Sequence, residues 1–482
     1  MDTENITKYE IEAKRYGSYD VVVCGGGTAG VCAAIAAARE GVKTLLIERS
    51  FTVGGMLTVG EAGITKFTEH CSDAKIYKDE VIDALATEPE KVQVVGGIAR
   101  EYARRMLKDG KALGTSGEAG SYIFTDKAAA QWVLIQMLME AGVEVLYDTR
   151  VCLVKMDGET VTGVIVVNKE GFCEIEAKQI IDTTGDADVA ALAGVPFNFG
   201  ASEYDIKEGF AKEVGQTHEF GTMFRVRGVD YERLFEYLEE DPDRFYKQPF
   251  GIMSFENVKE SYFKGDMCVF GISVNHLIDE RWLQIYNLPE KGGAILLGPC
   301  CSYQDSNGLD ARKLSAGQHA LQEGVHRLCD VIKIIPGFEN IEVTYIPEVG
   351  VRETRHIIGE YVINAMDIAL GRDFEDSVAC GGHPIDISPR PKEIEDMDMN
   401  HWRFHIPYRI MLPKNAENLL VAGRCVSATR GASGAIRPTA QCMALGEAAG
   451  VAAALAVKRG VTPKTVDITE LRNTLIKNGA VL

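Results

Sequence analysis

The stretch Asp20-Val-Val-Val-Cys24-Gly-Gly-Gly-Thr-Ala-Gly30 decides the fold of this chain. Its three valines are typical of a buried parallel strand. The glycines satisfy the pattern G-x-G-x-x-G, and a helix of small residues is predicted from Val31 to about Glu40. A second strand, Lys43 to Ile47, ends at Glu48. Strand, glycine turn, helix and strand in this order predict a dinucleotide-binding unit.

Each glycine of the pattern has a physical role in holding a dinucleotide. Gly25 permits the tight turn, Gly27 lets the backbone approach a pyrophosphate, and Gly30 lets the helix pack closely on the strand. The N–H groups at the helix start then face the two phosphates. Glu48, 23 residues after Gly25, is placed to bind the ribose hydroxyls and would repel a 2′-phosphate. The ligand expected here is NAD or FAD rather than NADP.

The chain after this unit distinguishes between the two cofactors. Strands are predicted at 151–156, 161–168 and 172–176, joined by Asp-Gly and Glu-Gly turns that are typical of hairpins. A buried strand at 179–182 then runs into Thr183-Thr-Gly-Asp186. A Rossmann start that is interrupted by a meander and closed by T-G-D resembles the FAD domain of glutathione-reductase type.

The C-terminal end continues this pattern. Another parallel-type strand, Asn418 to Ala422, ends in Gly423-Arg424, and Arg437-Pro-Thr439 opens an Ala/Gly-rich helix that extends to about Lys458. Pro438 suits the first turn of a helix. The start of this helix could direct partial positive charge at the flavin N1–C2=O edge. Its small residues also suit close packing alone, and the two interpretations are compatible.

Together these stretches resemble the FAD-dependent oxidoreductase family, in the clan shared with the fumarate reductase and succinate dehydrogenase flavoproteins. The resemblance also rests on E-R-S-F-T-V-G-G-M-L-T, T-T-G-D-A-D-V-A-A-L-A-G-V-P-F, G-V-R-E-T-R-H-I-I-G-E-Y, H-P-I-D-I and I-P-Y-R. It implies an α/β fold, with a Rossmann-like FAD-binding domain of glutathione-reductase type and an inserted α+β substrate domain. The expected boundaries are 1–197 and 405–482 for the FAD-binding domain and 198–404 for the substrate domain.

The resemblance also implies the residues that contact FAD. The chain has no histidine between Gly25 and Glu69, where succinate dehydrogenase attaches its flavin covalently, so FAD is expected to be held noncovalently. The implied FAD contacts are Gly25, Gly27, Ala29, Gly30, Glu48, Arg49, Gly55, Met56, Val151, Gly185, Asp186, Gly423, Arg424 and Arg437.

Two arginines are candidates for holding substrate charge, because flavin chemistry often needs a cation beside the substrate as well as a group that moves a proton. Arg352 and Arg355, in G-V-R-E-T-R-H, could clamp a carboxylate or meet the flavin. The alternative is a buried structural network with Glu353 and Glu360. The sequence leaves these alternatives open.

Histidines are the candidates for proton transfer. His383 lies in a glycine-rich loop before Pro384, where an aromatic residue is commoner in the family. His405 is a candidate to face the substrate. His401 and His405 have i, i+4 spacing, but a strand would hold them roughly 13 Å apart, so no metal is expected. The candidate catalytic residues are therefore His383, Arg352 and His405.

Composition limits the partners of the chain. Its 482 residues include 51 basic against 70 acidic side chains, a net charge of −19, which argues against a nucleic-acid partner. The 12 cysteines contain no C-x-x-C pair, and adjacent Cys300 and Cys301 are expected to be inert. The apolar stretch Met443 to Val457 is interrupted by Glu447 and is shorter than the ~20 residues of a membrane span. A cytoplasmic protein without a membrane span is expected.

The function expected from these features is hydride transfer between a small organic substrate and flavin N5. Desaturation or reduction next to a carbonyl or carboxylate is favoured over alcohol or amine oxidation. An NAD-dependent dehydrogenase is the other enzyme class, and T-G-D after a meander argues against it. A non-enzyme or RNA-modifying flavoprotein is disfavoured, the latter by the charge. The substrate, the direction, the electron acceptor or donor and the oligomeric state stay open at this level.

Overall fold

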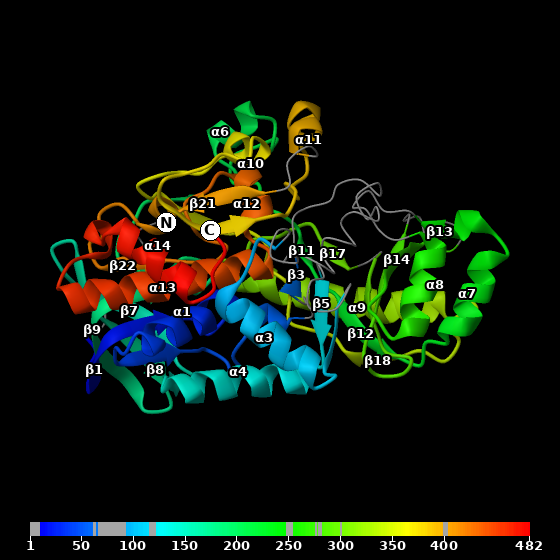
Figure 1. Ribbon diagram of the computed structural model, residues 1–482, viewed down its shortest axis with the longest axis horizontal. Coiled ribbons are helices and arrows are strands. Elements are labelled where there is room, and N and C mark those ends of the chain that lie inside the picture. Colours follow the sequence, from blue (N-terminus) through cyan, green and yellow to red (C-terminus); the bar gives the residue numbers. More distant parts are fainter. Residues whose placement is uncertain are drawn as a thin grey trace.

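The structure is a computed structural model, which describes residues 10–60, 64–65, 93–114, 122–246, 254–274, 277, 282–298, 301–398 and 403–482. Two large sheets lie toward opposite ends of the long axis of the molecule, and helices pack on each of them (Figure 1). The predicted mixed α/β fold with a parallel sheet is confirmed.

The first sheet is built around the strand that precedes the glycine turn. Its order is β6-β2-β1-β9-β8-β7. Strand β22 pairs with the C-terminal end of β9, beyond the residues of β9 that pair with β8. Strands β6, β2, β1, β9 and β22 run parallel, whereas β7, β8 and β9 form the antiparallel meander. The strands are β1 (Lys14–Cys24), β2 (Thr44–Ile47), β6 (Glu144–Leu146), β7 (Arg150–Asp157), β8 (Thr160–Asn168), β9 (Gly171–Asp182) and β22 (Leu419–Val421).

One prediction for this sheet is wrong: the third meander strand and the buried strand at 179–182 are a single strand, β9. The reason is that β1 begins at Lys14 rather than at Asp20, so its ladder supports β9 over its whole length. Lys14 pairs with Cys173 and Cys24 pairs with Asp182. Among the polar residues near the expected interruption, Glu176 lies on this shared ladder and is half-exposed, and Lys178 is exposed.

Helices α1 (Thr28–Arg39) and α13 (Thr439–Arg459) pack against each other at close range. A Cβ atom at Gly446 would lie 2.0 Å from the Ala29 carbonyl oxygen, and Gly450 meets α1 in the same way. Helix α13 is buried along most of its length, and Figure 1 shows it lying beside α1. The small residues of α13 therefore serve helix packing and hold the first turn of α1 in place.

The bounds of α13 agree with the predicted helix, which opens at 437–439 and extends to about Lys458, but the helix is longer than the apolar stretch 443–457 that was considered as a membrane span. The helix has 21 residues, because it includes the first-turn residue Thr439 and the basic end at Arg459, and Pro438 is its N-cap. Among the described residues, α13 is the one helix whose length and apolar composition would allow it to cross a membrane. However, 89% of its most apolar window is buried inside the protein, which is the position of a core helix.

Glu447 is a buried carboxyl in the middle of α13. Its Oε2 atom accepts a hydrogen bond of 2.9 Å from the Ile98 N–H at the start of helix α3 (Gly97–Lys108). Burial raises the pKa of Glu447 to about 7, although the Ile98 N–H and the charge of Arg39 oppose this rise. The folded chain therefore keeps a proton here that the unfolded chain has released.

This proton predicts a pH-dependent stability. The contribution of protonated Glu447 is complete below about pH 4.5 and is lost as pH rises through about 7, because the folded state then has to ionise a buried group. We expect Glu447→Gln to match the parent at pH 5 and to be about 2–3 kcal/mol more stable than it at pH 8. Thermal unfolding of both proteins at the two pH values measures this difference. Burial raises the pKa of Asp182 to about 6, and this group adds the same pH dependence to the stability of both proteins. Equal pH slopes would contradict the prediction.

The second sheet is antiparallel and has its own core. Its order is β13-β14-β15-β16-β12-β18, and helices α7 (Tyr231–Glu239), α8 (Phe255–Lys264) and α9 (Ala311–Ile332) belong to the same part of the molecule (Figure 1). Buried residues from Phe224 to Ile341 form a core separate from that of α1 and α13. The strands are β12 (Phe224–Arg227), β13 (Phe245–Tyr246), β14 (Val269–Ile272), β15 (Leu283–Asn287), β16 (Ala294–Leu297) and β18 (Glu342–Tyr345).

After the second sheet the chain returns to the first core. Apolar side chains between Ile363 and Leu412 are buried together with those of α1 and α13. The remaining paired strands are β10 (Phe197–Phe199) with β19 (Arg355–Ile357), β11 (Phe220–Gly221) with β17 (Ser302–Tyr303), β20 (Ser377–Gly381) with β21 (Phe404–Pro407), and β5 (Tyr122–Thr125) with β3 (Ile64–Thr65) and β4 (Ala112–Gly114). The remaining helices are α4 (Lys127–Ala141), α5 (Asp188–Leu192), α6 (Glu203–Lys207), α10 (Ala365–Ala369), α11 (Lys392–Asp398), α12 (Arg430–Ile436) and α14 (Ile468–Lys477).

Candidate active site

The turn between β1 and α1 has the form of a phosphate cradle. Gly25 has a φ of +104°, and a Cβ atom at Gly30 would lie 1.8 Å from the Gly25 carbonyl oxygen, so both positions require glycine. Gly27 is the N-cap of α1, which has no side-chain cap. A Cβ atom at Gly27 would meet nothing within 4 Å. Open space beside uncapped helix N–H groups is the arrangement that a pyrophosphate needs.

Glu48 lies at the end of β2, beside this turn. Its Oε2 atom accepts a hydrogen bond of 2.7 Å from the Gly26 N–H, and its Oε1 atom accepts one of 2.8 Å from the Ser50 N–H. Gly55, with a φ of +51°, lies against the turn, since its Cβ atom would be 3.1 Å from the Gly27 Cα atom. Glu48 and Gly55, which were both predicted to contact the cofactor, therefore lie beside the glycine turn.

A second group of predicted residues gathers around Asp186. Its Oδ1 atom accepts hydrogen bonds of 2.6 Å from the Thr354 hydroxyl and 2.6 Å from Arg424 Nη2. Burial raises the pKa of Asp186, but the charge of Arg424, the hydrogen bonds from Thr354 and Arg424 and the charge of Arg49 together outweigh burial, and the net shift is downward. A Cβ atom at Gly185 would lie 2.7 Å from Arg424 Nη1. A Cβ atom at Gly423 would lie 3.5 Å from Ala29 Cβ, so this group adjoins the start of α1.

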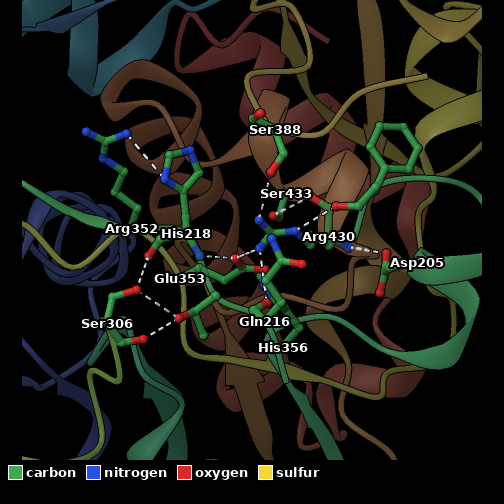
Figure 2. A network of polar contacts seen from close by, with 12 residues as sticks. Asp205, Gln216, His218, Ser306, Arg352, Glu353, His356, Ser388, Arg430 and Ser433 are labelled. Atoms are coloured by element: carbon green, nitrogen blue, oxygen red, sulfur yellow. Dashed lines mark hydrogen bonds and ion pairs between the residues drawn. The ribbon is translucent and has the colours of Figure 1, made fainter. Parts of the chain in front are cut away.

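A cluster of polar side chains includes Arg352, which is near Thr354 in the sequence. Arg352 is two residues before Thr354, and its Nη1 atom is 3.3 Å from His218 Nδ1 (Figure 2). Arg437 donates a hydrogen bond of 2.6 Å to Asp386. We name Arg352, His218, His383, Asp386 and Arg437 the polar cluster. It includes two of the predicted catalytic residues, His383 and Arg352.

The members of the polar cluster shift one another's pKa values. Burial is the largest cause that lowers the pKa of His218, to about 3, and the charges of Arg352 and Arg437 add to it. Burial and the charge of Arg437 also lower the pKa of Arg352. The pKa of Asp386 is lowered overall, because Arg437, His383, Arg352 and His218 together outweigh burial. At neutral pH, His218 is therefore uncharged and Asp386 is ionised.

The predicted alternative, in which Arg352 and Arg355 pair with glutamates, is wrong. Glu353 forms its ion pair with Arg430, and Glu360 lies 3.7 Å from Lys464. Arg355 donates a hydrogen bond of 2.9 Å to Asp188 and lies outside the polar cluster. Arg352 has no ion pair with a carboxylate among the residues that the structure describes. Alternate side chains of this segment point in different directions, as an extended chain requires.

Arg430 holds the surroundings of the polar cluster in place. Its guanidinium is 2% exposed and contacts the Glu353 carboxylate and the backbone oxygens of Phe210, Gln216 and Ser388. Figure 2 shows Arg430 at the centre of this network, with Arg352 and His218 beside it. Arg430 thus joins the loop before His218, the segment that carries Arg352 and the loop that carries His383.

His405 lies apart from the polar cluster. Its Nδ1 atom is 3.5 Å from Cys380 Sγ and 3.8 Å from Asp373 Oδ1. Burial lowers its pKa. His401 and Cys300 lie outside the described residues. The predictions for the pairs His401–His405 and Cys300–Cys301 therefore stay predictions. In the described part of the chain, no group of three His, Cys, Asp or Glu residues is arranged to hold a metal ion.

Sequence reasoning missed three members of this site. His218 lies in Thr217-His-Glu-Phe-Gly221, which has neither a motif nor a regular period. Asp386 belongs to H-P-I-D-I, a stretch that carries the family resemblance and from which only His383 was predicted as a site residue. Arg430 begins the small-residue helix α12 and is the largest fully buried side chain of the described residues. Of the three, only Asp386 had a signal in the sequence.

Comparison with protein families gives a match over most of the chain. The family described as FAD dependent oxidoreductase matches residues 20–475. Among curated proteins, the NADH:fumarate oxidoreductase of Klebsiella pneumoniae (strain 342) is 28% identical over 202 residues, which are 35% of this chain and 20% of that protein. Digeranylgeranylglycerophospholipid reductase 1 of Methanococcoides burtonii is 27% identical over 180 residues, which are 37% of this chain and 40% of that protein.

A third curated relative has a different substrate in its name. The tRNA uridine 5-carboxymethylaminomethyl modification enzyme MnmG of Dichelobacter nodosus is 27% identical over 244 residues, which are 46% of this chain and 34% of that protein. The matched stretches thus span less than half of each of these relatives. A solved structure, p-nitrophenol 4-monooxygenase PnpA from Pseudomonas putida DLL-E4, is 14% identical with a TM-score of 0.44, and covers 96% of this chain and 87% of that one.

Proposed function

The chain belongs to the FAD-dependent oxidoreductase family, and from this premise we propose that it transfers a hydride between a small organic substrate and flavin N5. The reaction that we favour is desaturation or reduction next to a carbonyl or carboxylate, and alcohol or amine oxidation is the second candidate. The observation that carries the proposal is the position of Arg352, a cation without a carboxylate partner in the described chain, two residues from the Asp186–Thr354 hydrogen bond.

The residues present suit a noncovalently held FAD. We assign the pyrophosphate to the open space at Gly27 and the N–H groups of α1, and the ribose to Glu48. Asp186 and Arg424 adjoin the start of α1 and complete the wall of this site. FAD, when bound, supplies the carrier of the hydride.

Arg352 is suited to hold an anionic substrate. Arg352 is half-buried and forms no ion pair with a carboxylate of the described residues. Burial and the charge of Arg437 lower its pKa, although the charges of Asp386 and Glu219 oppose this. Asp386 is not such an ion-pair partner, because it binds Arg437 at 2.6 Å. A substrate carboxylate would compensate the Arg352 charge and would fix the orientation of the substrate.

His383 is suited to move a proton. Its Nδ1 atom is 2.6 Å from the Pro384 carbonyl oxygen, which can only accept, so Nδ1 carries the proton of this hydrogen bond. The Nε2 atom is then the nitrogen that takes or gives a proton, and the nearby Asp386 carboxylate stabilises the protonated ring. Orientation of one ring nitrogen by a backbone oxygen is the usual support for such a histidine.

The division of the chain into domains remains part of this proposal. The separate core of the second sheet supports a substrate domain inserted within residues 198–404. The burial of residues 363–412 in the first core favours a return to the FAD-binding domain earlier than residue 405. A cytoplasmic location and a glutathione-reductase type of domain also stay proposals.

The test of the proposed function uses the flavin as its own reporter. The purified protein is expected to be yellow, and a small carboxylate or carbonyl compound, added without oxygen, is expected to bleach the oxidised flavin or reoxidise the reduced one. A panel of acids, ketones, alcohols and amines distinguishes the two candidate reactions. Flavin that responds only to alcohols or amines would replace the first reaction with the second, and flavin that responds to none would refute both.

Replacement of Arg352 tests the role of its charge. We expect Arg352→Met to keep FAD and to lose about 10- to 100-fold in kcat/KM, mainly through a higher KM, because one charge-assisted hydrogen bond contributes about 1.5–3 kcal/mol. Arg227→Met, on the exposed ion pair with Glu342, is the matched control. An unchanged KM for the substrate found above would show that Arg352 does not hold it.

A further inference from the structure

The backbone turn at residues 54–60 closes on itself and lies against the glycine turn. The Gly55 carbonyl oxygen accepts hydrogen bonds from the N–H groups of Thr58, Val59 and Gly60, at 3.0, 2.8 and 3.1 Å. The N–H group of Gly54 donates a hydrogen bond of 2.7 Å to the Gly26 carbonyl oxygen. The 54–60 turn therefore borders the space that we assign to the pyrophosphate.

The second sheet reaches the 54–60 turn through Tyr345. The Tyr345 hydroxyl donates a hydrogen bond of 2.7 Å to the Val59 carbonyl oxygen, which is 286 positions away in the sequence. This carbonyl and the Gly60 N–H group belong to one peptide group, and the N–H group donates to Gly55 on the other side. Because a peptide group is planar, bonds at both its ends fix its orientation.

The side chain of Met56 lies over this peptide group. A Cβ atom at Gly60 would lie 2.7 Å from both Sδ and Cε of Met56, so the Met56 side chain occupies the space that a larger residue 60 would need. Met56 is exposed, and the family resemblance predicts that it contacts FAD. The Tyr345 hydroxyl is thus joined by one peptide group to a side chain that is expected to meet the cofactor.

We propose that Tyr345 is a positioning residue of the cofactor site. Through the Val59–Gly60 peptide group, its hydroxyl holds Met56 in the place where Met56 contacts bound FAD. The proposal rests on the proposed function, because it takes FAD to occupy this site. It goes beyond that function by giving the second sheet a part in binding the cofactor.

The orientation of Tyr345 is supported by neighbouring contacts. Lys127, the first residue of α4, places its Nζ atom over the Tyr345 ring. Tyr345 is paired in register with Arg225 of β12, whose Nη2 atom donates a hydrogen bond of 3.1 Å to the Thr125 carbonyl oxygen. Paired residues on adjacent strands point to the same face of a sheet. This face of the second sheet therefore meets the start of α4 and the 54–60 turn together.

The first experiment removes the hydroxyl and keeps the ring. We expect Tyr345→Phe to bind FAD about threefold to tenfold more weakly than the parent, the effect of one lost hydrogen bond. Tyr231→Phe is the matched control, because the Tyr231 hydroxyl donates a similar hydrogen bond of 3.0 Å to the Gly293 carbonyl oxygen, away from the turn. It should keep the FAD affinity of the parent. Titration of the cofactor-free proteins with FAD, followed by flavin fluorescence, measures the affinities.

The outcomes of this experiment separate the two proposals. If Tyr345→Phe binds FAD as tightly as the parent, or if Tyr231→Phe loses as much affinity as Tyr345→Phe, Tyr345 does not position the cofactor site, while the proposed function stands. A parent that binds no FAD would refute the proposed function and the role of Tyr345 together.

The second experiment tests whether Tyr345 acts through Met56. In a Met56→Ala background, Tyr345→Phe should weaken FAD binding by a smaller factor than in the parent, because the side chain that it positions is already absent. The visible circular dichroism of bound FAD should change in the same direction in Tyr345→Phe and in Met56→Ala, and should stay unchanged in Tyr231→Phe. An equal factor in both backgrounds, or an unchanged spectrum in Tyr345→Phe, would overturn the proposal.

Discussion

Replacing Gly27 by valine is expected to leave the chain folded but unable to hold FAD. The φ of Gly27 is −70°, which every residue adopts, and its added Cβ atom would meet nothing within 4 Å. The fold therefore does not require glycine at this position. The side chain would instead fill the space that we assign to the pyrophosphate, at the uncapped start of α1. We expect a loss of at least about 1,000-fold in FAD affinity, which corresponds to about 4 kcal/mol.

Two measurements separate this effect from misfolding. The far-ultraviolet circular dichroism and the thermal midpoint of the cofactor-free variant should match those of the cofactor-free parent. Titration with FAD, followed by quenching of flavin fluorescence, should then show the lost affinity. Gly27→Ala is a graded control that should lose less. A valine variant that binds FAD as the parent does would place the pyrophosphate elsewhere.

Replacing His383 by alanine is expected to keep FAD and to slow reduction or reoxidation of the flavin by the substrate by about 10²- to 10⁴-fold, the usual contribution of a proton-transferring side chain. The reason is that Nδ1 is already used by Pro384, so Nε2 is the group that exchanges the proton. The loss should appear in kcat rather than in KM. Single-turnover absorbance of the flavin, with and without oxygen excluded, measures the step directly.

The pH profile and a rescue experiment give this prediction its controls. In the parent, kcat should change with pH as His383 gains or loses its proton, and the alanine variant should lack this change. Added imidazole should restore part of the rate, since it supplies the missing nitrogen. His326→Ala, an exposed histidine of α9, should leave the rate unchanged. Retention of the parent rate and its pH dependence by His383→Ala would remove His383 from the chemistry.

The glycine turn that we assign to the cofactor could be predicted from the sequence because its requirements are local. The turn at Gly25 and the close contact at Gly30 depend on the backbone of neighbouring residues, so glycine at these positions is informative by itself. The length of β9 was predicted wrongly for the opposite reason. Its continuity depends on pairing with β1, whose start at Lys14 precedes any apolar pattern.

The polar cluster, which we propose holds the substrate, could be predicted only in fragments, because its members meet through tertiary packing. Arg352 and His383 were chosen from local motifs, but nothing in either motif indicated that they share a cluster. The ion pair between Glu353 and Arg430 joins residues 77 positions apart and left no period or motif in the sequence. His218 lies in a loop, where side-chain direction has no repeating pattern to reveal it.

The hydrogen bond between Thr354 and Asp186 has a consequence for how variants of this protein are interpreted. It joins the segment that carries Arg352 to Asp186, which we assign to the cofactor site, so under the proposed function we expect the affinities for cofactor and substrate to be thermodynamically linked. A substitution at residues 352–356 that weakens FAD binding would therefore not identify a cofactor ligand. Conversely, a tightly bound carboxylate should slow the exchange of FAD with the solvent, and the rate of cofactor exchange becomes a measure of substrate occupancy.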